Sequence, residues 1–482
     1  MLFNSWRFAI FLPIVFILYW ALPHRYRWIL LFAASYYFYM SWNVKYVVLI
    51  LFTTAVSYFA AIFLEKTEDT HKKKLILWVT LIACLGVLFV FKYFNWFFES
   101  LSAILSIFTI KLQPITLKWL LPVGISFYTF QTLSYVIDVY RGKVKAEHHF
   151  GIYATFISFF PQLVAGPIER TQNLLPQIKA EHHFSCEQAT YGLKLMAVGF
   201  FKKMVVADNF APYVDTVFAD VHSYSGFALL IAAMMFAIQI YCDFSGYSDI
   251  ARGTSKLMGI ELMENFKSPF LSSSVKETWG RWHISLTSWF RDYVYIPLGG
   301  SRCSRWRYRL NIFITFLVSG LWHGASWTYV FWGGLSGLGQ IFEDIFGIKS
   351  YTKKRNGIWV IRVIIAFTFF YLCAAFFRAE TISDAFYLIS HIPVGLSHPI
   401  EYLRSGFTMN NWLDKEYFAF AARFLIGAVP LLIYDYFSLD HDVIAEVSRW
   451  KAPARYALYF AVMIVICMFR AANGVTFVYF QF

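Results

Sequence analysis

Stretches of apolar residues long enough to cross a lipid bilayer recur throughout this 482-residue chain. Only helices and closed barrels span membranes, because every backbone polar group there must find a partner within the protein. Runs of this length match helices, which need about 20 residues to cross the hydrocarbon core. The composition agrees, since 59% of residues are hydrophobic and 15% charged, against about 45–50% and about 25% in soluble domains. The sequence therefore predicts an all-α, polytopic membrane protein.

The apolar runs predict about 10–12 transmembrane helices, at about 20 residues for each crossing. No Pro-, Ser- or Gly-rich linker divides them, so residues 1–482 are predicted to form one membrane domain. The clearest runs are Phe8–Leu22, Trp28–Trp42, Tyr46–Leu64, Leu75–Phe98, Trp119–Val139, Ala189–Phe201, Phe227–Tyr241, Trp359–Phe377, Tyr417–Tyr436 and Tyr456–Phe469. Residues 156–170, FISFFPQLVAGPIER, hold prolines and a glycine within an apolar run, which predicts a broken or re-entrant helix.

The basic residues indicate how the chain is oriented. The formal net charge is +13, and Lys and Arg gather in short turns such as residues 24–27, 72–74 and 141–145. Such clusters mark the cytoplasmic side of membrane proteins. Alternating helices from the first cluster place the N-terminus outside the cytoplasm and residues 381–392, TISDAFYLISHI, on the extracytoplasmic membrane surface. Because topology accounts for the charge, nucleic-acid binding is excluded.

Neither the cysteines nor a repeated pair of histidines indicates a metal or disulfide site. The six cysteines form no CxxC pair. The hexapeptide KAEHHF occurs at residues 145–150 and 179–184. Histidines that bind metals need partners at defined spacing, and nothing fixes such a geometry in these segments. We expect these histidines to flank membrane segments, and we predict no metal site.

His323 is the first candidate for chemistry. It lies in Trp322-His323-Gly324, within an apolar run that begins at Leu310. An ionisable side chain at membrane depth is a functional hypothesis by default, and a neutral histidine bonded to a neighbouring helix is the structural alternative. Burial keeps an imidazole neutral, the state in which it accepts a proton. We therefore predict His323 to be a general base in acyl transfer, with Trp322 as a supporting candidate.

His283 is the second candidate and belongs to a more polar segment, predicted near the cytoplasmic face. Holding a turn and taking part in catalysis are both open roles for it. Nearby Arg281 is a candidate for binding lipid phosphates or an anionic cofactor. Upstream, YCDFSGYSDIARG contains Asp243, which so close to an apolar helix must be paired or solvated, with Arg252 one available partner. We interpret this motif as a polar network lining the active cavity, since no G-x-S-x-G elbow is present.

Four segments carry a family resemblance: RWHISLTSWFRDYVYIPLGG at residues 281–300, LWHGASWTYVFWGG at 321–334, CDFSGYSDIARG at 242–253, and residues 156–170. Together they resemble the membrane-bound O-acyltransferase family, and in particular its bacterial branch. The resemblance covers essentially the whole chain. Both signature histidines of the family are matched, in order, by His283 and His323.

This resemblance implies a ring of tilted helices around a thin central wall, with a tunnel through the membrane. It implies that His323 is the essential catalytic residue and His283 the second signature position. It also implies that an acyl group passes from a cytoplasmic thioester, acetyl-CoA or another, to a cell-surface polysaccharide such as alginate or peptidoglycan. No cofactor would be bound permanently, an extracytoplasmic partner protein would complete the transfer, and the chain would lie among lipids of the bacterial cytoplasmic membrane.

Two alternatives stay open at this point. The first is transfer of D-alanine to teichoic acid, which belongs to the same branch of the family. The second is a non-catalytic transporter of a polysaccharide or a lipid-linked sugar. Transporters are often built from repeated helix bundles, and the sequence shows no such repeat.

Overall fold

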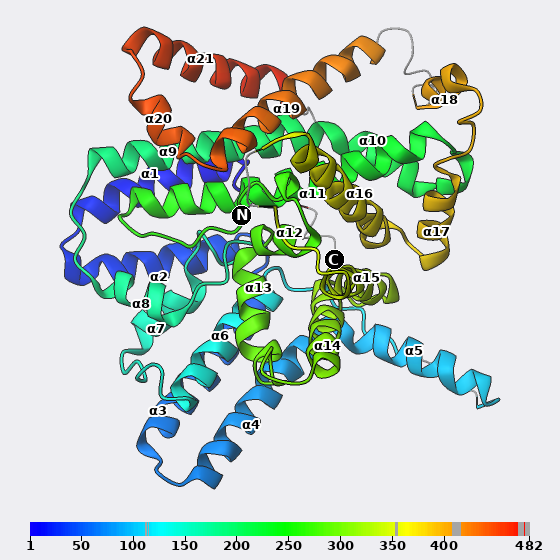
Figure 1. Cartoon of the computed structure of the whole chain (residues 1–482). Coiled ribbons are helices and arrows are strands. Elements are labelled where there is room, and N and C mark those ends of the chain that lie inside the picture. The colour runs from blue at the N-terminus through cyan, green and yellow to red at the C-terminus, as the bar shows by residue number, and fades with distance from the viewer. Residues whose placement is uncertain (111–112, 114, 352–354, 407–415, 471–476, 478–482) are drawn as a thin grey trace. The chain divides into compact units, whose positions relative to one another are not determined.

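The computed structural model describes all residues except 111–112, 114, 352–354, 407–415, 471–476 and 478–482, and it leaves the side chains of residues 416–423 aside. Every regular element in the described part is a helix, which confirms the predicted all-α class. Contacts divide the chain into two compact units, Met1–Leu193 with Ala251–Met263, and Lys194–Ile250 with Glu264–Phe482. Figure 1 shows the helices of both units. That residues 1–482 form one membrane domain stays a prediction.

The first unit contains the N-terminal predicted helices. Four of them are α1 (Trp6–Ala21), α2 (His24–Met40), α3 (Val47–Lys66) and α4 (Thr70–Leu88), close to the predicted bounds. The fourth continues through a π-helical turn, η2 (Phe89–Tyr93), into α5 (Phe94–Ile107). The next helix, α6 (Ile125–Tyr140), begins later than its apolar run because Gly124 adopts a left-handed conformation, with φ +76°. An apolar run therefore marks a helix well but its first residue less well.

The predicted break within residues 156–170 is confirmed. Helix α7 (Phe150–Ser158) ends before Pro161, and α8 (Thr171–Lys179) begins after this segment. Between them the Glu169 carboxylate is buried and accepts hydrogen bonds from the Met263 N–H at 2.6 Å and the Asn173 Nδ2 at 2.7 Å. Irregular chain inside a membrane protein is tolerated where the protein satisfies its polar groups in this way.

The repeated KAEHHF segments make structural contacts in the same unit. Lys179 of the second copy pairs with Glu147 of the first at 2.9 Å. His149 Nδ1 accepts the Ile152 N–H at the start of α7, and His148 Nε2 lies 2.8 Å from a Glu65 carboxylate oxygen. Among the described residues, no group of three or more His, Cys, Asp or Glu side chains is arranged to hold a metal ion.

The second unit carries both signature histidines. Helix α9 (Cys186–Phe200) begins in the first unit and continues into the second, and the long helix α11 (Phe227–Leu257) begins in the second unit and ends in the first. Its other main elements are η3 (Phe201–Ala207), α10 (Asp208–Ala219), α12 (Val275–Arg281), α13 (Ile284–Phe290), η6 (Arg291–Tyr295), α14 (Arg305–His323), α15 (Trp327–Ile345), α16 (Gly357–Arg378), α17 (Ile382–His391), α18 (Pro399–Ser405), α19 (Glu416–Ser438), α20 (Val443–Ser448) and α21 (Ala452–Phe469). The helix predicted within residues 381–392 is confirmed as α17, and its place on a membrane surface stays a prediction.

Several helical stretches can cross a membrane. Within the described residues, five are long and apolar enough: Val44–Lys66, Thr70–Ile107, Phe227–Leu257, Gly357–Arg378 and Ala452–Phe469. Trp6–Ala21 and Phe424–Ser438 are apolar but shorter. These helices confirm a polytopic membrane protein, while the number of about 10–12 crossings, at about 20 residues each, stays a prediction.

Candidate active site

The hairpin of α14 and α15 positions His323, the last residue of α14. The two helices cross where Gly320 meets Gly333, and a Cβ on either glycine would strike backbone atoms of the other helix. Such close approach is what small residues allow between membrane helices. The connecting loop is short, and Ser326 starts α15 by accepting the Thr328 N–H at 3.3 Å. The hairpin therefore fixes the end of α14 closely.

Aromatic rings enclose the His323 imidazole. Its ring centroid lies 4.9 Å from that of Trp322, 5.1 Å from that of Trp332 and 5.4 Å from that of Phe377. The side chain is buried and lines a small cavity. The remaining lining residues are apolar or aromatic: Ile240, Trp282, Trp332, Phe370, Ala374 and Phe377. His323 is thus the one residue lining this cavity whose side chain can take up a proton near neutral pH.

His283 lies in a tight turn between α12 and α13. Its backbone is left-handed, with φ +43° and ψ 54°, a conformation that costs a non-glycine residue roughly 1–3 kcal/mol and persists only where its surroundings enforce it. Asn265 enforces it from across the turn. Its carbonyl accepts the Ile284 N–H at 2.9 Å, and its side-chain oxygen accepts the Ser285 N–H at 3.1 Å. The turn is therefore built at a defined energetic cost, which is frequent at functional sites.

The surroundings of His283 correct one expectation. The flanking sequence is polar and predicted a polar environment, but only 1% of His283 is exposed and its ring packs 4.6 Å from that of Phe244. Burial lowers the pKa of His283 from its usual value of 6.5 to about 3. The imidazole is therefore neutral at physiological pH, and its chemistry is that of a hydrogen-bonding group rather than a cation.

The two signature histidines meet although 40 positions separate them. Their ring centroids are 6.5 Å apart, and the Trp322 ring lies within 6.0 Å of that of His283 as well as beside His323. The structure thus brings together three residues singled out from sequence. Their catalytic roles stay predictions, because proximity alone does not assign them.

Asp243 belongs to a buried ionic network on α11, a helix that continues well past its predicted end at Tyr241. Lys203 Nζ lies 2.5 Å from an Asp243 oxygen and 2.8 Å from an Asp208 oxygen. Lys202 Nζ lies 2.7 Å from an Asp249 oxygen. Both lysines, at which the apolar run Ala189–Phe201 was predicted to end, are buried in the π-helical turn η3, which continues that helix.

This ionic network lies next to the contact between Phe244 and His283. Asp243 is followed directly by Phe244, the ring packed on His283, so the ion pairs hold α11 where that contact forms. Paired charges of this kind are costly to bury and costly to break. Asp243 thus belongs to a polar network, as inferred from its motif, and its role in the reaction stays a prediction.

Arg281 lies at the end of α12 and pairs with Glu277 of the same helix at 2.5 Å. This helix is fixed at its other end by Glu343 of α15. The buried Glu343 carboxylate accepts the Val275 N–H at 2.6 Å and the Lys276 N–H at 2.9 Å. The first N–H groups of a helix need such acceptors, and a negative charge there also suits the helix dipole. Glu343 thus joins α12, and with it the His283 turn, to the His323 hairpin.

Sequence reasoning missed Glu343, Lys203 and Trp332 as members of the site. Lys203 carried a usable signal, since the pair Lys202-Lys203 has apolar residues on both sides and such lysines are candidates for burial with partners. Glu343 carried none, because its partners are backbone groups far away in the chain. Trp332 looked like one aromatic residue among many.

Comparison with known proteins identifies the family of this chain. The model of the membrane-bound O-acyltransferase family matches residues 144–383. A probable alginate O-acetylase of Pseudomonas aeruginosa is 39% identical over 80% of this chain and 73% of its own length. A peptidoglycan O-acetyltransferase of Helicobacter pylori is 33% identical over 82% of this chain and 80% of its own length. A teichoic acid D-alanyltransferase of Streptococcus thermophilus is 31% identical, over 54% of this chain and 67% of its own length.

Both candidate histidines, the hairpin and the His283 turn fall inside the matched range of residues. The relatives are bacterial, and the apolar helices are those of a polytopic membrane protein, so this chain is a bacterial membrane protein. With identities above 30% over most of both sequences, the chain belongs to the membrane-bound O-acyltransferase family and is an O-acyltransferase.

Proposed function

We propose that this protein transfers acetyl groups from a cytoplasmic thioester across the membrane for O-acetylation of a cell-surface polysaccharide, alginate or peptidoglycan. The observation that carries the mechanism is the position of His323. It is the one residue suited to proton transfer among those that line an otherwise apolar cavity. Relatives named for acetylation of these two polymers match most of the chain, and this supports acetyl as the transferred group.

In the proposed reaction His323 acts as the general base. The neutral imidazole takes the proton of an acceptor hydroxyl as the oxygen attacks the thioester carbonyl carbon. A carbon–oxygen bond forms, the carbon–sulfur bond breaks, and the proton passes from the imidazolium to the leaving thiolate. Aromatic walls exclude water, which would otherwise hydrolyse the thioester. His283, neutral and buried beside Trp322, positions His323 or the incoming acyl group.

The other parts of the proposal concern donor, partners and membrane. The donor is acetyl-CoA or another acyl thioester, used as a substrate, with no permanently bound cofactor. An extracytoplasmic partner protein carries the acetyl group to the polysaccharide. The chain lies in the bacterial cytoplasmic membrane with its N-terminus outside. Arg281, partly exposed and paired with Glu277, supports the turn that carries His283 rather than binding the donor directly.

The test replaces His323 by alanine in cells that depend on this protein for surface acetylation. Loss of a general base costs about 10²–10⁴-fold in rate, so acetate released from the polymer by mild alkali should fall to background. His441→Ala is the matched control, because that histidine is exposed and lies outside the site. Immunoblotting checks that all variants accumulate equally. Persistent acetylation in the His323→Ala strain at normal protein levels would contradict the assignment.

The nature of the acyl group needs a separate measurement. Cells are fed radiolabelled acetate or radiolabelled alanine, and the label in the isolated polymer is compared between parent and His323→Ala strains. We expect His323-dependent label from acetate. His323-dependent label from alanine in teichoic acid would instead assign the protein to D-alanyl transfer.

A further inference from the structure

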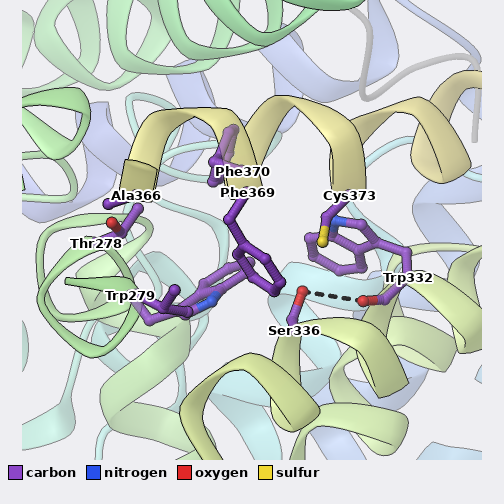
Figure 2. A pocket seen from close by; sticks show the side chains of 9 residues that line it. Thr278, Trp279, Trp332, Ser336, Ala366, Phe369, Phe370 and Cys373 are labelled. Carbon is purple, nitrogen blue, oxygen red and sulfur yellow. Dashed lines mark hydrogen bonds between the residues drawn. The ribbon is translucent and has the colours of Figure 1, made fainter. Parts of the chain in front are cut away.

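A second cavity lies beside the one that contains His323. It is formed by side chains of α12, α15 and α16 (Figure 2). Its lining residues are Val275, Thr278, Trp279, Trp332, Ser336, Ala366, Phe369, Phe370 and Cys373. Each cavity has a volume of about 10 Å³ for the centre of a water-sized sphere, which is room for about one water molecule. Neither accepts a long acyl chain as it stands.

The second cavity offers only apolar surface. Its two hydroxyl groups are already engaged, since Thr278 Oγ1 donates to the Ser274 carbonyl at 3.0 Å and Ser336 Oγ to the Trp332 carbonyl at 2.9 Å (Figure 2). The Cys373 side chain is buried and behaves as a small apolar group. An apolar lining of this kind favours hydrocarbon over water or polar groups. A polar acceptor sugar would find no partner in this cavity.

Two aromatic residues, Trp332 and Phe370, line both cavities and separate them. The Trp332 ring lies 5.1 Å from that of His323 on one side and 5.5 Å from that of Trp279 on the other. The Phe370 ring lies 4.9 Å from that of Trp282 and 6.2 Å from that of Trp279. Because both rings line both cavities, they form a shared partition between His323 and the second cavity.

We propose that this partition determines acyl length. The methyl carbon of an acetyl group is about the size of the one water molecule that the His323 cavity can hold, whereas the third and fourth carbons of a butyryl group would have to enter the second cavity. Trp332 and Phe370 block that path, so the protein selects a two-carbon acyl group. The inference rests on the proposed function, because it concerns the substrate of the same site.

The expected selectivity follows from the size of the groups involved. Each methylene in an apolar pocket changes the rate by about 10–200-fold. Removing the Phe370 ring joins the two cavities and gives the extra carbons an apolar surface of Trp279, Ala366 and Cys373. Butyryl transfer relative to acetyl transfer should then rise by at least about 10-fold.

The experiment compares acyl transfer in membrane vesicles that hold the full-length protein with its native acceptor system. Radiolabelled acetyl and butyryl thioesters are supplied to separate samples, and the ratio of label in the polymer is measured. We expect Phe370→Ala to raise the butyryl-to-acetyl ratio. Adding Ser336→Leu to that variant refills the second cavity and should return the ratio toward that of the parent.

Phe367→Ala is the matched control, because that ring packs 5.0 Å from Phe270 and lines neither cavity. An equal rise in this control would overturn the proposal, since it would show general loosening. Acetyl transfer with an unchanged ratio in Phe370→Ala would overturn it as well. Should Phe370→Ala not accumulate, Phe370→Leu is judged by the same criteria. Parental vesicles that transfer no acetyl group would instead contradict the proposed function itself.

Discussion

Replacing Glu343 by alanine should loosen α12 and with it the turn that carries His283. The substitution removes both carboxylate oxygens that accept the Val275 and Lys276 N–H groups. Hydrogen bonds to a charged group contribute about 1.5–3 kcal/mol each, so the two together set an upper limit of about 6 kcal/mol. Because α12 begins at a loop, water replaces part of the loss, and we expect about 3 kcal/mol.

Thermal unfolding in detergent measures this cost. In a 482-residue chain each kcal/mol shifts the apparent Tm by about 1 °C, so the Tm should fall by roughly 3 °C. Glu343→Gln keeps one acceptor oxygen and should lose about half as much. The neighbouring Asp344→Asn is the matched control, since it breaks only the partly exposed pair with Arg309, and exposed pairs contribute about 0–1 kcal/mol. A Glu343→Ala variant that melts with the parent, or no lower than Asp344→Asn, would refute the reasoning.

Two further predictions concern buried charges. Lys203→Met leaves the Asp208 and Asp243 carboxylates without this cation and should cost about 3–5 kcal/mol of stability. Size-exclusion chromatography should show a loss of monodisperse protein, which adding Asp243→Asn should partly recover. A normal yield of the single variant would contradict this prediction. Burial raises the pKa of Glu169 from 4.5 to about 7. The folded state therefore holds more protons than the unfolded state between these values, and stability should fall as pH rises through this window. Glu169→Gln should reduce the resulting drop in Tm, and an unchanged pH profile would exclude this carboxyl group as its source.

The sequence predicted those features that depend on local pattern. Apolar runs gave the helices, since a chain in lipid has no other way to satisfy its backbone along a single segment. Prolines within residues 156–170 gave the break between α7 and α8. His323 stood out because an ionisable group in an apolar run has few structural explanations.

Features that depend on contacts between distant segments were not predictable in the same way. The pair Lys202 and Lys203 looks like the basic end of a membrane helix, and its burial follows only from carboxylates some 40 residues later on α11. His283 has polar neighbours in sequence and aromatic ones in space. Residues adjacent in sequence indicate the environment of an exposed segment. A turn packed among helices is instead surrounded by residues of those helices.

The distance between the two histidines depends on α15 more than on the chain that joins them. The backbone of Gly333 on this helix packs closely against that of Gly320 on α14, and this contact positions His323. Glu343, further along the same helix, accepts the first N–H groups of α12, and these hydrogen bonds position the turn that carries His283. Trp332, directly before Gly333, lies beside His323 and Trp279. A rigid helix that holds both partners fixes their separation, so changes at Gly333 and Glu343 should affect the site non-additively although neither residue touches the reacting groups.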